Sequence, residues 1–207
     1  NNGGDALVAA RHLKAGWFRV TVVFAADFAK QPAKLPADAA AALRSWLAAG
    51  GAVLDAIPAD GRWDLVIDGL FGIGLARNLS ERYLELVGQV NRLALLAIPI
   101  LALDVPSGLD ADTGQIFGAA IRASHTLTFI ALKPGLLTAY GTDYCGALHV
   151  ANLGLEPASL LPPQGRLLDQ TVAAVLPPRP RNSHKGLSGS VGILGGAESM
   201  GGAALLS

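Results

Sequence analysis

The sequence predicts an α/β fold in three layers, with a mostly parallel sheet covered by helices on both faces. Two observations lead to this prediction: short apolar or β-branched runs alternate with helix-like segments, and polar, glycine-rich turns follow several of those runs. Alternation of this kind is typical of βαβ units, whose strands run parallel and are buried. Because ligands bind beyond the carboxyl ends of such strands, we expect the polar turns to share one rim.

The first elements are predicted from local composition. Residues 6–15 are rich in Ala and Leu and stop at Gly16, which indicates a helix with a glycine cap. The β-branched and aromatic run 18–25 predicts a strand. The Ala-rich run 37–49 predicts a helix that Gly50 and Gly51 end.

The remaining elements continue the alternation and complete a Rossmann-like order. Residues 64–68 predict a short buried strand, and residues 80–96 predict an amphipathic helix with Ser80 as its N-cap. Residues 99–104, 125–132 and 147–153 predict three more strands. Because the polar residues 1–5 precede a helix, we expect them to follow a strand that the sequence lacks, and so to lie on the same rim.

Composition excludes several classes of protein. With 51% hydrophobic residues, the chain has enough apolar material for one buried core and part of a second. Lys and Arg (16) balance Asp and Glu (16), so no basic surplus indicates nucleic-acid binding. The longest apolar run, 93–105, contains Pro99 and Asp104 and does not predict a membrane span. The single cysteine, Cys145, excludes an internal disulfide and is expected to be a small buried thiol.

Changes in composition along the sequence divide the chain into three parts. Residues 1–156 are expected to form the α/β domain, and residues 157–182 contain six prolines and predict a linker with a short amphipathic piece at 167–176. In residues 183–207, a strand at 190–196 ending in glycines precedes a helix start, which predicts the beginning of a second α/β domain. No signal peptide is visible, and a cytoplasmic protein is expected; because the chain begins inside a motif, its natural N-terminus is expected to lie further upstream.

Four segments in order resemble the YjeF N-terminal domain family, which contains the NAD(P)H-hydrate epimerases; they are residues 1–6, 68–75, 103–110 and 125–136. Residues 184–196 are similar to the start of the ribokinase-like NAD(P)H-hydrate dehydratase domain that uses ADP or ATP. Together they resemble the bifunctional repair proteins that join both domains. Two departures stand out. Ala6 replaces a usual glycine, and the family's first helices and strand, with the Gly-Pro-Gly before Asn1, are absent.

The resemblance implies a function in metabolite repair, the interconversion of the R and S forms of hydrated NADH and NADPH (NADHX and NADPHX). It implies potassium as cofactor, ADP or ATP only for the dehydratase part, a homo-oligomer, and neither nucleic acid nor membrane as partner. The reaction breaks a carbon–oxygen bond and remakes it on the other face of the ring. One carboxyl group within hydrogen-bond reach can deliver and then remove the proton.

The resemblance also assigns roles to particular residues. Asp104 matches the catalytic acid/base, while Asn2, Asp68 and Ser107 match the potassium ligands, and oxygen ligands of this kind suit a hard cation. The predicted substrate-binding residues are Asp104 and two polar stretches: Asn1, Asn2, Gly3, Gly4 and Asp5, and Gly72, Ile73, Gly74, Leu75, Ala76, Arg77 and Asn78. Glycines in the second stretch let backbone amides approach an anion.

Other interpretations of these residues stay open at this point. Asp104 can instead cap its own turn by accepting from the amide of Ser107 or Gly108, and each potassium ligand can make only local hydrogen bonds. Arg77 is as compatible with an exposed position, and Lys133 with either the pocket rim or the surface. A non-catalytic scaffold module of the same fold is the alternative function. An ordinary NAD-dependent dehydrogenase is disfavoured, because the glycine spacing of a dinucleotide-binding turn is missing.

Overall fold

The structure is a computed structural model that describes residues 2–24, 35–168, 174, 178, 180–197 and 201–206. The chain divides into two compact units, Asn1–Pro162 and Pro163–Ser207. The division lies inside the expected linker, whereas the assignment of the parts to separate domain families stays a prediction. The predicted amphipathic piece at 167–176 falls largely outside the described residues.

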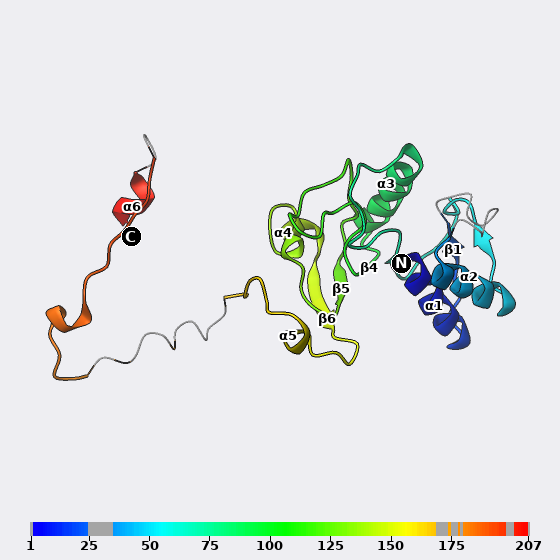
Figure 1. Cartoon of the computed structure of the whole chain (residues 1–207). Helices are drawn as coiled ribbons and strands as arrows, with labels where there is room; N and C mark the ends of the chain where they lie inside the picture. The colour runs from blue at the N-terminus through cyan, green and yellow to red at the C-terminus, as the bar shows by residue number, and fades with distance from the viewer. Residues whose placement is uncertain are drawn as a thin grey trace. The chain divides into compact units, whose positions relative to one another are not determined.

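The first part of the N-terminal unit contains two helices over two short strands (Figure 1). Helix α1 (Asn2–Ala15) precedes strand β1 (Val22–Val23), and helix α2 (Ala37–Ala48) precedes strand β2 (Val53–Leu54). The two strands pair in parallel. Leu7 and Ala10 of α1 pack against Leu43 and Trp46 of α2, which gives this part its own buried core.

The second part contains a parallel sheet in the order β3-β4-β5-β6. Its strands are β3 (Val66–Asp68), β4 (Ile100–Leu103), β5 (His125–Phe129) and β6 (Ala147–Ala151). Helix α3 (Glu81–Leu95) buries Val87 and Val90 against Ile100 and Ala102 of β4. Asp68 pairs with Ala102, and Leu103 with Leu127, so three strands end along the same edge of the sheet.

Short helical turns complete this unit. They are η3 (Pro134–Leu136), α4 (Gly141–Tyr144) and α5 (Pro157–Leu160). Cys145, at the end of α4, packs with Val105, Leu109 and Leu136 in a second cluster beneath the β4 turn. Cys145 is buried, which confirms the prediction of a small buried thiol, and burial raises the pKa of this thiol to about 11.

The parallel α/β architecture is confirmed, but several boundaries differ from prediction. Helix α1 begins at Asn2, so residues 2–5 form its first turn and not a loop before it. The left-handed residue after α1 is Trp17 (φ 66°) and not Gly16. The strand expected at 18–25 shrinks to Val22–Val23, and β2 was not predicted. Strands β1 and β2 form a sheet separate from β3–β6.

The C-terminal unit contains η5 (Lys185–Ser188) and α6 (Gly202–Leu206) among its described residues. Helix α6 agrees with the expected helix start. In contrast, residues 190–196 form no strand among the described residues, and the expected strand stays a prediction. Across the part of the chain that the structure describes, none of the helices has the length and apolarity that a membrane crossing requires.

Candidate functional site

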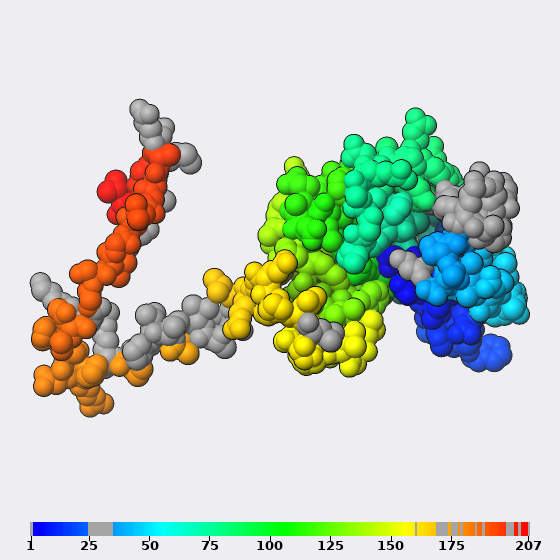
Figure 2. All heavy atoms as spheres, viewed as in Figure 1, coloured from blue at the N-terminus to red at the C-terminus, as the bar shows by residue number. Residues whose placement is uncertain are grey.

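The site lies where the first turn of α1 meets the ends of β3 and β4. The side-chain Nδ2 of Asn2 donates to the carbonyl oxygen of Phe71 at 2.7 Å and to that of Leu103 at 2.9 Å. One side chain of the helix therefore holds the turns that follow both strands. Figure 2 shows α1 (blue) against the green surface of the four-stranded part.

Helix α1 approaches the β3 turn so closely that only glycine fits beneath it. A Cβ atom added to Gly69 would lie 2.5 Å from the Cβ atom of Ala6 and 3.3 Å from the carbonyl oxygen of Asn2. The extra methyl group of Ala6, where the family usually has glycine, therefore fits in the space above Gly69. The departure from the family pattern leaves the helix start in contact with the rim.

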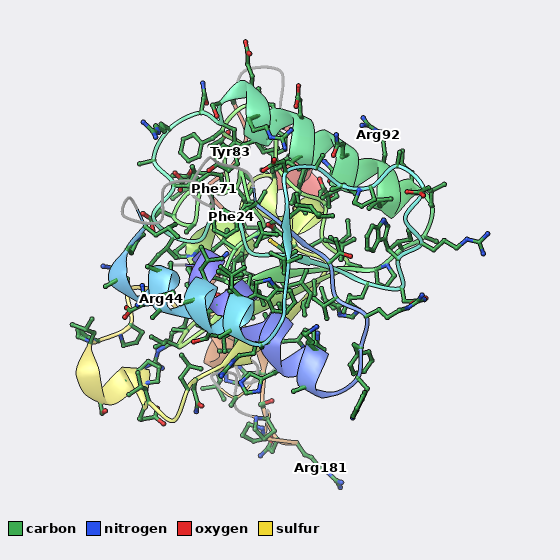
Figure 3. The ribbon with its side chains drawn as sticks, turned by 90° about the vertical axis from the view of Figure 1, so that its right-hand side faces the viewer. Phe24, Arg44, Phe71, Tyr83, Arg92 and Arg181 are labelled. Atoms are coloured by element: carbon green, nitrogen blue, oxygen red, sulfur yellow. The ribbon has the colours of Figure 1, made fainter. Side chains whose placement is uncertain are left out.

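Asp68 and Ser107 form a buried cluster, which we call the Asp68–Ser107 cluster. The Ser107 hydroxyl donates to Asp68 Oδ1 at 2.6 Å, and the Ser107 amide donates to Asp68 Oδ2 at 2.8 Å. Ser107 Oγ also accepts from the Phe71 amide at 2.9 Å, and Asp68 Oδ1 accepts from the Leu70 amide at 3.2 Å. The Phe71 ring lies edge-on to Tyr83 of α3, with centroids 4.6 Å apart (Figure 3). The cluster thus fastens both turns to the helix layer.

Two features, one of Asp68 and one of Asn2, suit a bound cation. Burial raises the pKa of Asp68 to about 6, although hydrogen bonds from Ser107 and Leu70 act in the opposite direction. The side-chain oxygen of Asn2 is buried and has no hydrogen-bond partner among the described residues. One carboxylate with amide and hydroxyl oxygens fits a monovalent hard cation. The described residues contain no group of three His, Cys, Asp or Glu side chains that could hold a metal ion.

Asp104 occupies an unusual backbone position at the end of β4. Its φ of 66° lies in the left-handed region, which Asp tolerates better than most residues, and its amide donates to the carbonyl oxygen of Leu127 at 2.8 Å. The carboxylate accepts from Lys133 Nζ through Oδ1 at 2.8 Å and from the Ile73 amide through Oδ2 at 3.1 Å. The Ser107 amide donates to Asp68, so the alternative in which Asp104 caps its own turn through that amide is wrong.

Gly72 leaves room for this carboxylate. A Cβ atom at position 72 would lie 2.6 Å from Asp104 Oδ2. The absence of a side chain, rather than an unusual backbone angle, is what the site requires here. The glycine-rich stretch therefore shapes the position of Asp104 as well as the wall beside it.

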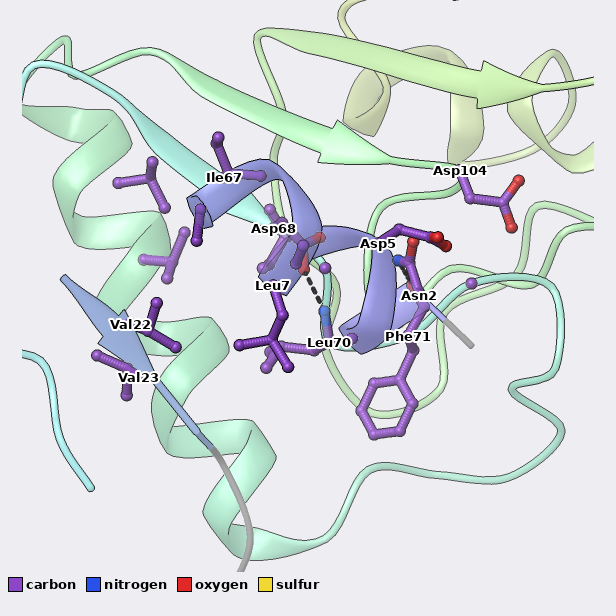
Figure 4. Close-up of a pocket in the computed structure, with 18 of the residues that line it drawn as sticks. Asn2, Asp5, Leu7, Val22, Val23, Ile67, Asp68, Leu70, Phe71 and Asp104 are labelled. Atoms are coloured by element: carbon purple, nitrogen blue, oxygen red, sulfur yellow. Dashed lines mark hydrogen bonds between the residues drawn. The ribbon is translucent and has the colours of Figure 1, made fainter. Parts of the chain in front are cut away.

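A cavity of about 1740 Å³ joins these groups. The predicted residues on its wall are Asn2, Gly3, Asp5, Asp68, Gly72, Ile73, Gly74, Leu75 and Asp104. The strand residues Val22 and Val23 line its apolar side, away from the polar group of Asn2, Asp5 and Asp104 (Figure 4). Partial desolvation raises the pKa of Asp5, and the charge of Asp104 adds to that shift, so the two carboxylates share one space.

The structure does not bring every predicted residue to the cavity wall. The residues off the wall are Gly4, Ala76, Arg77, Asn78 and Ser107. Arg77 is exposed, in agreement with the alternative left open for it, and Asn1 lies outside the described residues. The roles assigned to all these residues stay predictions.

Lys133 is the site residue whose place the sequence left open. It lines the cavity, its side chain is only 17% exposed, and it forms an ion pair with Asp104. The available signal was a lysine directly after a strand and before Pro134, at the edge where the other polar turns gather. That signal placed the residue near the rim but did not show which way the side chain points.

The fold and the site define a parallel α/β protein whose cavity contains buried and half-buried carboxylates at the carboxyl ends of its strands. The family model for YjeF-related protein N-terminus matches residues 1–135, and the chain belongs to this family. A solved structure of yeast ynu0 has the same fold, with a TM-score of 0.57 and 22% identity over 75% of this chain and 63% of that one.

Several curated relatives are similar to the chain. The bifunctional NAD(P)H-hydrate repair enzyme of Leishmania infantum is 40% identical over 100% of this chain and 38% of its own length. The repair enzyme of Vibrio cholerae is 44% identical over 84% of this chain and 36% of its own length. The NAD(P)H-hydrate epimerase of Bordetella bronchiseptica is 48% identical over 77% of this chain and 68% of its own length. The chain thus spans less than two fifths of the bifunctional relatives.

Proposed function

We propose that this chain carries an NAD(P)H-hydrate epimerase activity, an isomerase that interconverts the R and S hydrates of NADH and NADPH. A relative named NAD(P)H-hydrate epimerase aligns with 77% of this chain, and the family model matches residues 1–135. The observation that supports the chemistry is the Asp104 carboxylate on the cavity wall, where two donors from other elements hold it. A carboxyl group in that position can exchange a proton with a bound ligand.

In the proposed reaction, Asp104 serves the oxygen that leaves and enters the nicotinamide ring. Asp104 gives a proton to the hydroxyl oxygen, the electron pair of the ring nitrogen breaks the carbon–oxygen bond, and water leaves a positively charged ring and an ionised Asp104. Water then adds to the other face and gives one proton back, so atoms and charge balance over the cycle. The reaction needs neither an oxidant nor a covalent nucleophile, and Asp104 is the single proton carrier in this scheme.

We assign substrate binding to the first turn of α1 and to residues 72–75. The positive end of α1 and the free amides of its first turn suit an anion such as the dinucleotide's diphosphate. Gly3 and Gly74 leave their backbone accessible on the cavity wall. Fewer contacts support the assignment of Gly4 and residues 76–78, which lie off the cavity wall, and Asn1 is assigned from the sequence alone.

We assign potassium to Asn2, Asp68 and Ser107. The buried, unpartnered oxygen of Asn2 and the desolvated carboxylate of Asp68 support this assignment. A bound cation there would offset the charge of Asp68 and hold the α1 start against the β3 and β4 turns. A homo-oligomer and a cytoplasmic location remain proposals from the resemblance, as does dehydration of the S form with ADP or ATP by longer relatives of this chain.

The decisive experiment compares Asp104→Asn with the parent chain on separated R and S hydrates. We expect interconversion to fall by about 10²- to 10⁴-fold, the usual contribution of a positioned acid/base, with an unchanged melting temperature. Asp112→Asn is the matched control, because Asp112 is an exposed carboxylate in the same segment and lies off the cavity wall.

Two outcomes would contradict the proposal. An Asp104→Asn variant as active as the parent would remove Asp104 from the reaction. A parent chain that binds both hydrates without interconverting them would instead identify a non-catalytic binding module of this fold.

A further inference from the structure

We propose that Lys133 is a positioning residue that fixes the orientation of the Asp104 carboxylate in the reaction. The inference rests on the proposed function, because it gives Lys133 a role only through Asp104. It concerns a side chain from the segment between β5 and η3, which supplies none of the residues assigned above. Three features of its surroundings support it.

The first feature is the way the backbone presents Lys133. The residue follows the end of β5 and has an extended conformation (φ −99°, ψ 141°), as residues before proline prefer. Pro134 then begins η3, in which Gly135 and Leu136 are buried. The Gly135 amide donates to the carbonyl oxygen of Ala111 at 2.7 Å. The base of the lysine side chain is therefore anchored on its C-terminal side.

The second feature is the saturation of the ammonium group. Lys133 Nζ lies 2.8 Å from Asp104 Oδ1, 2.7 Å from Thr128 Oγ1 and 2.7 Å from the carbonyl oxygen of Phe129. An ammonium group has three N–H donors, and these three acceptors use them all. Lys133 has no donor left for a ligand in this arrangement, so it acts through Asp104.

The third feature is the pair of opposed contacts on the carboxylate. Lys133 holds Oδ1, and the Ile73 amide holds Oδ2, so rotation of the carboxylate plane breaks at least one bond. The side chains of Lys133 and Asp104 are 17% and 13% exposed, so water replaces these contacts poorly. Loss of Lys133 should therefore misalign the carboxylate while the cavity walls that bind the dinucleotide stay in place.

The test begins with Lys133→Met, which keeps the length of the side chain and removes the charge. We expect kcat to fall by about 10²-fold, the usual cost of a misplaced catalytic group, while KM stays near that of the parent. Lys14→Met is the matched control, because Lys14 lies in the last turn of α1, off the cavity wall, and its loss changes the net charge equally.

A second variant keeps the test decisive if Lys133→Met folds poorly. Lys133→Cys can be alkylated with 2-bromoethylamine, which restores an ammonium group at nearly the original reach, or with iodoacetamide, which restores no charge. Cys145 is buried, and the parent treated in the same way controls for its reaction. We expect only the aminoethyl form to recover kcat, a result that a purely structural role would not produce.

Each outcome separates the two proposals. A parent without epimerase activity overturns both of them. An active parent with a fully active Lys133→Met variant overturns the role of Lys133 alone. A variant whose loss appears in KM with kcat unchanged also overturns it, because Lys133 would then contribute to binding. Equal recovery with iodoacetamide would show that bulk, and not the ammonium group, is what the position requires.

Discussion

Two carboxylates follow neighbouring parallel strands of this protein, yet their surroundings differ. Asp68 is 3% exposed and is held by the turns next to it, with both oxygens bonded to Ser107. Asp104 lies on the cavity wall and is held by Lys133 and by the Ile73 amide, which come from two other elements. The comparison indicates that the first carboxylate holds the rim together, whereas the second faces the cavity, where the proposed function places the substrate.

Phe71 connects the two regions. Its amide donates to Ser107 of the cluster, and its carbonyl oxygen accepts from Asn2 of α1. Residues 72 and 73, which contact Asp104, follow it directly in the chain. A change in the Asp68–Ser107 cluster should therefore reduce stability first, whereas a change beside Asp104 should reduce activity first.

The largest effect on stability is expected from Ser107→Ala. The substitution removes the hydroxyl donor of the buried Asp68 and the acceptor of the Phe71 amide. We expect a loss of about 3 kcal/mol in the free energy of unfolding, measured by urea titration. Ser80→Ala is the control, because Ser80 precedes α3 without a side-chain capping bond. A Ser107→Ala variant as stable as this control would contradict the structural role of the cluster.

Gly72→Ala should separate activity from stability. The new methyl group would displace the Asp104 carboxylate, which is the end of a side chain and not backbone, so folding should be little affected. We expect kcat to fall by about tenfold, equivalent to about 1.4 kcal/mol in the activation free energy. Gly74→Ala tests the alternative of general loop damage on kcat, because a Cβ atom there meets nothing within 4 Å and any effect on substrate binding at this position would appear in KM. Equal losses in both variants would argue against a specific contact with Asp104.

The smallest expected effect is the pH dependence that Asp68 produces. Its pKa of about 6 in the folded state lies above the ordinary value of 3.8, so the folded state binds the additional proton. Stability should rise as pH falls from 7 to 5, by about 1 kcal/mol relative to Asp68→Asn. Potassium, which favours the ionised carboxylate, should stabilise the parent more at pH 7.5 than at pH 5.5.

The same measurements with tetramethylammonium provide the ionic-strength control for this prediction. Asp68→Asn should lose most of the dependence on potassium, because its side chain carries no charge. Identical melting temperatures in the two salts, at both pH values, would speak against a cation at Asn2, Asp68 and Ser107.

The sequence was sufficient for the parallel α/β class and for the positions of Asp68 and Asp104. A carboxylate at the end of an apolar run marks a strand end whatever the tertiary structure, and parallel strands bring such ends to one edge. The role of Lys133 was not predictable in this way. Its three bonds depend on the path of residues 130–133, where Ile130 has a φ of 69° that no local pattern signals.

Other differences also have physical causes. Helix α1 begins at Asn2 and not after Asp5, because tertiary bonds from Asn2 to Phe71 and Leu103 outweigh the low helix propensity of the two glycines. Position 72 requires glycine because the carboxylate of Asp104, 32 residues further along the chain, lies against it. The glycine-rich sequence by itself does not predict this contact.

The contact of Ala6 with Gly69 has a consequence for how this rim can vary. The two positions share the volume of a single methyl group, and residue 6 occupies it. A side chain at position 69 would lift the helix and carry the Asn2 amide away from both carbonyl oxygens that it binds. A side chain larger than glycine therefore fits at position 6 or at position 69, but not at both. Exchange of this region between two members of the family must then transfer the start of α1 together with the turn after β3.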